Sequence, residues 1–158
     1  MEYRQAIVQK LTAAGGFAEI PKQRKGAFTA QLNADQQCIH VNCLGNYPNI
    51  PLRAFDVVEA LLRKKQGKAL RGNAMNFRLG EERLPCDSVE GRVAHKLYGL
   101  SVGDVVFRRI TPLTCILVWA GVCVHGKGML IDSIYYKKIS ENIGKIKIPA
   151  NRPLNVKS

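Results

Sequence analysis

Five basic side chains occur within nine residues, with no acidic residue between them: Arg63, Lys64, Lys65, Lys68 and Arg71. Clustered lysines and arginines bind phosphates, because each neutralised phosphate releases a condensed counterion. The same cations surround the expected end of a helix, where positive charge offsets the negative end of the helix dipole. The cluster therefore predicts either a phosphate-contacting patch or a solvated helix end. A second basic run, Lys22 to Lys25, would extend a phosphate surface if the fold brought the two together.

A second candidate lies between residues 93 and 110. It combines a small residue, Ala94, with Leu97 and a glycine turn at Gly99-Leu100-Ser101, followed by apolar Val105. The segment resembles the helix-turn-helix of bacterial DNA-binding proteins. This local resemblance implies DNA binding by a second helix over residues 101–110. The nucleic-acid-binding candidates on this segment are Lys96, Ser101, Asp104, Arg108 and Arg109.

The resemblance covers residues 93–110 only, and it departs from the usual pattern in two ways. Tyr98 adds one residue before the glycine, and several apolar side chains (Val102, Val105, Val106 and Phe107) occupy the second helix. An ordinary pair of core helices joined by a glycine turn is the alternative interpretation.

The cysteine and histidine residues indicate free thiols and no metal or cofactor. Cys38, His40 and Cys43 form one grouping, and Cys123 with His125 forms another. Structural zinc sites use tight Cys-x-x-Cys pairs, and none is present. Five cysteines also leave an odd one, which excludes a complete intrachain disulfide framework and favours a reducing, cytoplasmic compartment.

No grouping of side chains predicts a catalytic site. The chain has neither a Walker phosphate loop nor a Gly-x-Ser-x-Gly nucleophile turn. Asp87 and Glu90 are assigned to the start of a helix, and Glu81-Glu82 to a turn. The sequence names no catalytic residue and leaves enzymatic activity uncertain, on balance against it.

The charge balance is the strongest global signal. Among 158 residues, 24 Lys and Arg face 12 Asp and Glu, for a formal net charge of +12 and a pI of about 9.8. Such a field attracts polyanions, of which nucleic acid is favoured over an acidic membrane surface. Aromatic residues make up only 7%, which argues against a base-stacking platform. The longest uncharged stretch, residues 110–124, is shorter than a membrane span.

Periodicity predicts the elements that must position these residues. Tyr3, Ile7 and Leu11 indicate a helix over 3–14, and Phe55, Val58 and Leu62 indicate another from Pro51 to about Gln66. The remaining predictions are hairpins over 28–43, 68–84 and 122–136, a helix over 87–98, a short helix or strand over 105–110, and a helix over 113–121 that begins at Thr111-Pro112.

These patterns predict an α+β fold with about four helices and two or three short antiparallel hairpins. Residues 1–148 form one domain, followed by a basic tail at 149–158. The predicted function is nucleic-acid binding, with duplex DNA favoured, and the predicted context is the recognition module of a defence or mobile-element system. The alternatives are a small nuclease-like enzyme and a basic protein-interaction module. The oligomeric state stays open.

Overall fold

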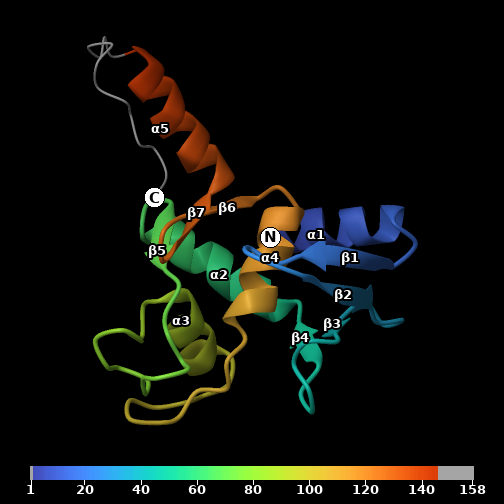
Figure 1. Cartoon of the computed structure of the whole chain (residues 1–158), viewed down its shortest axis with the longest axis horizontal. Helices are drawn as coiled ribbons and strands as arrows, with labels where there is room; N and C mark the ends of the chain where they lie inside the picture. The colour runs from blue at the N-terminus through green and yellow to red at the C-terminus, as the bar shows by residue number, and fades with distance from the viewer. Residues whose placement is uncertain (1, 146–158) are drawn as a thin grey trace.

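The structure is a computed structural model that describes residues 2–145. It contains five helices and two antiparallel sheets (Figure 1). The helices are α1 (Glu2–Ala13), α2 (Arg53–Lys64), α3 (Val89–Lys96), α4 (Ile110–Trp119) and α5 (Ser133–Lys145). The strands are β1 (Phe17–Pro21), β2 (Ala27–Leu32), β3 (Cys38–Val41), β4 (Asn49–Pro51), β5 (Lys68–Leu70), β6 (Cys123–His125) and β7 (Met129–Asp132). The predicted mixture of helices and antiparallel strands in one compact domain is confirmed, with one helix more than expected. The predicted tail at 149–158 lies outside the described residues.

Helix α4 lies at the centre of the fold. Seven of its ten residues are buried, and it contacts α1, α2, β1 and β6. A helix that is apolar on all sides is stable only when other elements surround it. In Figure 1 the four-stranded sheet lies on one side of α4, and the three-stranded sheet with α5 lies on the other. The start of α4 is therefore fixed with respect to both sheets.

The two sheets differ in how far apart in the sequence their paired strands lie. The first is a meander in the order β1-β2-β3-β4, in which each strand pairs with its neighbour in the sequence. The second has the order β5-β7-β6, so that Lys68 pairs with Ile131 across more than sixty residues of chain. Three-residue strand β5 has no hairpin partner of its own, and its place in the fold depends on this long-range pairing.

Two of the three predicted hairpins are present. Strands β2 and β3 form the first, and β6 and β7 form the third, although the third ends at Asp132, where α5 begins. The prediction of a hairpin over 68–84 was wrong, because β5 pairs with β7 and residues 71–88 form a long irregular segment. Pro51 also ends β4, opposite Cys38, instead of beginning α2.

The second helix expected from the helix-turn-helix resemblance does not form, and neither does the short element predicted over 105–110. Residues 97–109 are irregular up to the start of α4 at Ile110. The backbone of this segment forms hydrogen bonds with residue 79 instead of within a helix. The Gly103 N–H donates to the Leu79 carbonyl (2.8 Å), and the Leu79 N–H donates to the Asp104 carbonyl (3.0 Å). Gly99 and Gly103 also have positive φ angles of 68° and 95°, which end a right-handed helix.

The irregular segments pack on α3 around a small apolar cluster of their own. Leu79, Leu84, Ala94 and Val106 are its fully buried members. We call residues 71–88 and 97–109 together the loop lobe; in Figure 1 they surround α3. In a helix-turn-helix the small side chain of Ala94 would let a second helix approach; here Ala94 packs in this cluster instead.

The start of α3 differs from the predicted Asp87/Glu90 capping box. Ser88 is the N-cap, and its hydroxyl accepts a hydrogen bond from the Gly91 N–H at 3.1 Å. Asp87 instead pairs with Lys65 at 2.6 Å, and that hydrogen bond lowers the pKa of the Asp87 carboxyl. Glu90 points away from its own helix, toward the start of α4.

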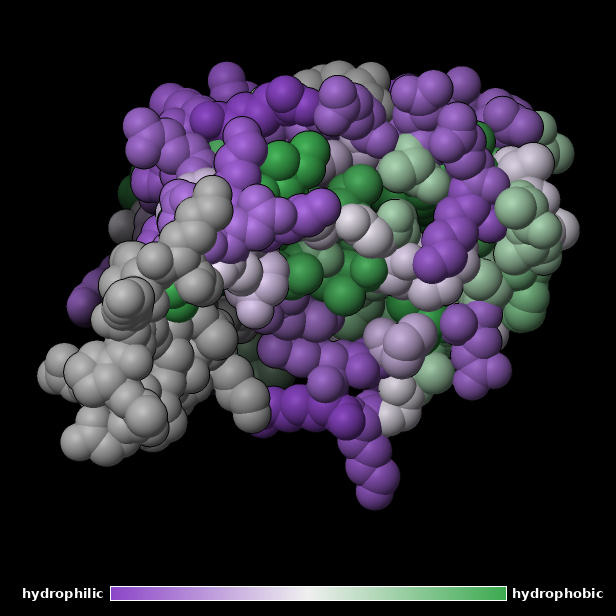
Figure 2. Space-filling view, turned by 90° about the horizontal axis from the view of Figure 1, so that it is seen from above, coloured by the Kyte–Doolittle hydropathy of each residue, from purple (hydrophilic) through white to green (hydrophobic). Residues whose placement is uncertain are grey.

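Over residues 2–145, no helix has the length and apolar content to cross a membrane. In Figure 2 hydrophilic residues follow the upper edge of the face, and apolar residues gather in its middle.

Gly91 provides a test of the packing beneath the loop lobe. A Cβ atom at this position would lie 2.0 Å from the Pro85 carbonyl oxygen and 2.8 Å from the Ser88 hydroxyl. Gly→Ala in a helix normally stabilises, but here we expect Gly91→Ala to lower the free energy of unfolding by about 1 to 3 kcal/mol. Urea denaturation would measure this, with exposed Gln9→Ala in α1 as the control. Equal or greater stability of Gly91→Ala would contradict the close approach.

Candidate functional site

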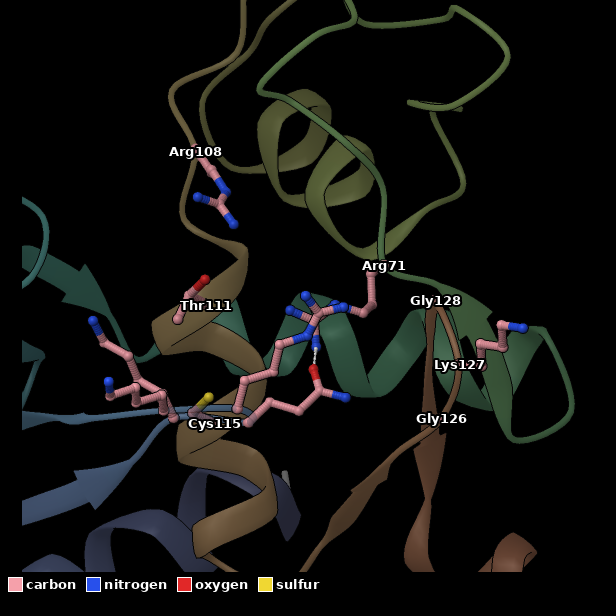
Figure 3. Close-up of a pocket in the computed structure, with 11 residues that line it drawn as sticks. Arg71, Arg108, Thr111, Cys115, Gly126, Lys127 and Gly128 are labelled. Atoms are coloured by element: carbon pink, nitrogen blue, oxygen red, sulfur yellow. Dashed lines mark hydrogen bonds between the residues drawn. The ribbon is translucent and has the colours of Figure 1, made fainter. Parts of the chain in front are cut away.

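A cleft of about 560 Å³ opens beside the start of α4. It is lined by α4 itself and by four other segments: the β1–β2 turn, the residue after β5, Arg108 before α4 and the β6–β7 turn. Its basic residues are Lys22, Arg24, Lys25, Arg71, Arg108 and Lys127. We call these six residues and the space between them the cationic cleft (Figure 3).

Arg71 lies at the centre of the cationic cleft, and its backbone is held from two sides. Its N–H donates to the Gly128 carbonyl, and its carbonyl accepts from the Glu90 N–H, both at 3.0 Å. Its guanidinium donates to the Gln23 side-chain oxygen at 2.9 Å, which is the contact drawn in Figure 3. Arg71 therefore joins the β1–β2 turn to the beginning of α3.

The partners of the Arg71 guanidinium are neutral. Its Nη1 lies 3.4 Å from His125 Nδ1, which acts as the acceptor because a guanidinium has only donors. Burial lowers the pKa of His125, and the charge of Arg71 lowers it further, so this imidazole is uncharged at pH 7. Burial likewise lowers the pKa of Arg71, and the nearby charges of Arg108 and Arg24 add to that effect. Arg71 still carries its proton at neutral pH, since guanidinium pKa values start above 12.

Arg108 extends from the segment that leads into α4. In Figure 3 its side chain points from the loop lobe toward the space in front of Arg71, whereas Lys127 points away from Arg71. The backbone next to Arg108 is held in position by hydrogen bonds of the two residues that follow it. The Glu90 carboxylate accepts the N–H of Arg109 at 2.9 Å and the N–H of Ile110 at 2.7 Å.

The lining of the cleft holds no counter-charge, although the buried carboxyl of Glu90 acts on Arg71 and Arg108 from outside that lining. No acidic residue lines the cavity, and within residues 2–145 none of its six cations forms an ion pair. Thr111, in the first turn of α4, lines the cavity as well. The N-terminus of a helix carries partial positive charge, which adds to the field of the side chains. The site therefore favours an anionic ligand with several negative groups.

Two adjoining cavities extend the cleft in different directions. One of about 630 Å³ shares Arg71, Arg108 and Gly128 and continues along the loop lobe to Met75 and Arg83. A smaller one of about 150 Å³ shares Lys22, Arg108 and Thr111 and reaches Cys43 and Leu44. Arg108 lines all three cavities, so it lies where they meet.

The structure separates the basic residues that lie together in the sequence. Only Arg71 and Arg108 of the predicted binding residues line the cleft. Arg63 pairs with Glu59 and with Glu2, and Lys65 pairs with Asp87. The exposed Lys64 and Lys96 line a shallow apolar groove between α2 and α3, and Lys68 is exposed on β5.

The other candidates from residues 93–110 have local partners. The Ser101 N–H donates to the Asp104 carboxylate at 2.7 Å, which closes a turn. The Arg109 guanidinium lies over the ring of Tyr98, 3.8 Å from its centroid, and over that of Phe107 at 4.6 Å.

Sequence reasoning anticipated the basic run at 22–25 as a possible extension of the Arg71 surface, and the structure places it there. It missed Lys127 and Thr111, because each is a single residue with no local pattern. Their contribution arises from the β5-β7-β6 pairing and from the position of α4, which no short motif records.

The cysteines include one at the edge of the cleft. Cys115 lies on α4, and burial raises the pKa of its thiol, so it is a neutral group there. All five cysteine thiols are free. In the part of the chain that the structure describes, no three His, Cys, Asp or Glu side chains lie close enough to hold a metal ion.

Comparison of the chain with protein-family models, with curated proteins and with solved structures finds no match. The function must therefore be argued from the geometry and charge of the site.

Glu90 makes the stability of the site depend on pH. Burial raises the pKa of its carboxyl from about 4.5 to about 7. Between these values the unfolded chain has lost the proton and the folded chain keeps it. Stability due to Glu90 should therefore fall as pH rises through this window, by about 3 kcal/mol at most, and level off above it.

Glu90→Gln removes this titration and keeps one acceptor oxygen. Urea denaturation between about pH 5 and pH 8 should show wild type losing stability relative to Glu90→Gln as pH rises. Glu82→Gln, at an exposed position of the loop lobe, serves as the control. Parallel pH profiles for wild type and Glu90→Gln would contradict the raised pKa.

Proposed function

We propose that this protein binds nucleic acid and that the cationic cleft contacts the phosphates. The observation that carries the proposal is that six basic residues from four segments line one cavity, with no acidic residue in its lining. A merely solubilising surface would have cations dispersed and paired with acids. Here Arg71, the half-buried member, is held by the neutral partners Gln23 and His125, which leaves its charge for a ligand.

Several features favour phosphates as the contacted groups. Arginine and lysine side chains are the main phosphate contacts in protein–nucleic-acid complexes, and helix N-termini contribute to them. The net charge of +12 supplies a long-range field that speeds association with a polyanion. Phosphate contacts position the nucleic acid without selecting a sequence, so the cleft accounts for affinity and not for a target sequence.

Binding without reaction is the function that the described residues support. A metal-dependent nuclease needs convergent carboxylates. The only acidic residue that lines any of the three connected cavities is Glu82, on the loop lobe. The alternatives of a nuclease-like enzyme and of a protein-interaction module thus have no specific feature in the cleft to favour them.

Charge reversal within the cleft tests the proposal. In Arg24→Glu/Arg108→Glu, both substituted side chains are exposed and outside any ion pair among residues 2–145, so the fold should persist. We expect binding of a short fluorescein-labelled oligonucleotide to weaken by about tenfold or more, with a shallower dependence on salt. Each lost phosphate contact should reduce the log–log salt slope by about 0.7 to 0.9. Fluorescence anisotropy at several salt concentrations measures both quantities.

The matched control is Lys64→Glu/Lys68→Glu. It changes the net charge equally, and both lysines are exposed outside the cleft. Its effect should be small, because it alters only the long-range field. Equal losses for the two double variants would show that net charge matters and that the cleft does not, which would overturn the proposal.

A further inference from the structure

Two aromatic rings that are distant in the sequence meet on the surface beside the cationic cleft. Tyr47, in the turn between β3 and β4, is 64% exposed, and Phe107, in the loop lobe, is 37% exposed. Their ring centroids are 5.2 Å apart at an interplanar angle of 70°, an edge-to-face contact. Rings of this size normally bury most of their area, so two touching, exposed rings indicate a surface with a ligand of its own.

A guanidinium completes the group. Arg109 lies over the Phe107 ring at 4.6 Å from its centroid, and over Tyr98 at 3.8 Å. Arg109 thus covers part of the Phe107 ring, and these two side chains support Tyr47, whose ring is the most exposed of the group. Bases stack on aromatic rings and on guanidinium groups, because every base has a π face.

This group adjoins the cationic cleft through two stretches of backbone. Arg108, where the three cavities meet, lies between Phe107 and Arg109 in the chain. The small cavity that Arg108 shares with Lys22 is also lined by Leu44, whose carbonyl accepts the Tyr47 N–H at 3.3 Å. The cleft and the aromatic rings are therefore joined through adjacent residues of the loop lobe and of the β3–β4 turn.

We propose that Tyr47, Phe107 and Arg109 form a base-stacking platform, and that the ligand of the cleft is single-stranded nucleic acid. This inference rests on the proposed function and names its substrate class. In a duplex the faces of the bases are covered by their neighbours, so a platform of exposed rings contributes only when bases are unpaired. The platform therefore selects single strands, whereas the cleft alone binds any phosphate chain.

Three probes of equal length separate the two parts of the site: a single-stranded oligonucleotide, its duplex, and an abasic single strand that keeps the phosphates and lacks the bases. Wild type should bind the single strand most tightly. Tyr47→Ala should weaken single-strand binding by about 5- to 100-fold and leave duplex and abasic binding unchanged. Tyr47→Trp should retain binding, and its added indole fluorescence should be quenched by the single strand alone.

Phe17→Ala is the matched control, because Phe17 is an aromatic side chain on β1 that is 51% exposed and lies in neither the platform nor the cleft. It should bind all three probes as wild type does. Circular dichroism and thermal melting check that each variant is folded. A Tyr47→Ala protein that loses affinity for all three probes equally would assign Tyr47 a positioning role and overturn the stacking proposal.

The remaining outcomes distinguish the two proposals. If wild type binds the three probes equally and Arg24→Glu/Arg108→Glu abolishes that binding, the cleft binds phosphates and the platform proposal fails. If wild type binds no probe, both proposals fail. If light scattering shows self-association that Tyr47→Ala abolishes, the rings form a contact between copies of the chain, and the stacking proposal is overturned.

Discussion

The buried carboxylate of Glu90 is the contact on which the site depends most. It is 1% exposed, and it accepts the N–H groups of Arg109 and Ile110. Its own N–H donates to the carbonyl of Arg71. One residue of α3 thus fixes the start of α4, the end of the loop lobe and the backbone of the central cleft arginine. The contact with Arg71 joins two backbone groups, whereas the contacts with Arg109 and Ile110 depend on the side-chain carboxylate of Glu90, which is held in place by burial.

The loop lobe shows how an irregular segment becomes a rigid support. Residues 97–109 have no helix to satisfy their backbone groups, so they use Leu79 on one side and Glu90 on the other. Val106 anchors the segment in the small cluster with Leu79, Leu84 and Ala94. The residues on either side of this anchor remain exposed, and Arg108 is presented to the cleft while Phe107 meets Tyr47. The segment thus joins the phosphate-binding and stacking parts of the proposed site.

The acidic residues determine which cations are left for a ligand. Glu59 is buried and accepts from Arg63, Asp87 pairs with Lys65, and Asp56 pairs with Arg4. These pairs join α1, α2 and the start of α3. The cleft has no such partners among the described residues, so six basic residues line it without an ion pair. An ion pair at the surface contributes little stability, but the absence of one from the cleft leaves the charges of its cations available to a ligand.

The sequence by itself determined the elements whose signals are local. The apolar period of Tyr3, Ile7 and Leu11 predicted α1, and the alternation around residues 33–35 predicted the β2–β3 hairpin. Both follow from contacts between residues a few positions apart. The mixed fold class and the α4 start near Thr111-Pro112 were likewise predictable, and so was the net positive charge. These properties depend on residue order and composition alone.

Only the tertiary structure decided where the charges lie and what Glu90 does. The spacing of residues 93–110 was compatible with a second helix. Instead of forming that helix, the backbone of this segment makes hydrogen bonds with Leu79 and with the carboxylate of Glu90. Likewise, five adjacent cations between 63 and 71 separated, because Glu59 and Asp87 paired with two of them while Arg71 turned into the cleft. The aromatic content is low in total, but long-range packing brought Tyr47 and Phe107 into contact. Each of these outcomes depends on contacts between distant parts of the chain, which no local pattern of residues specifies.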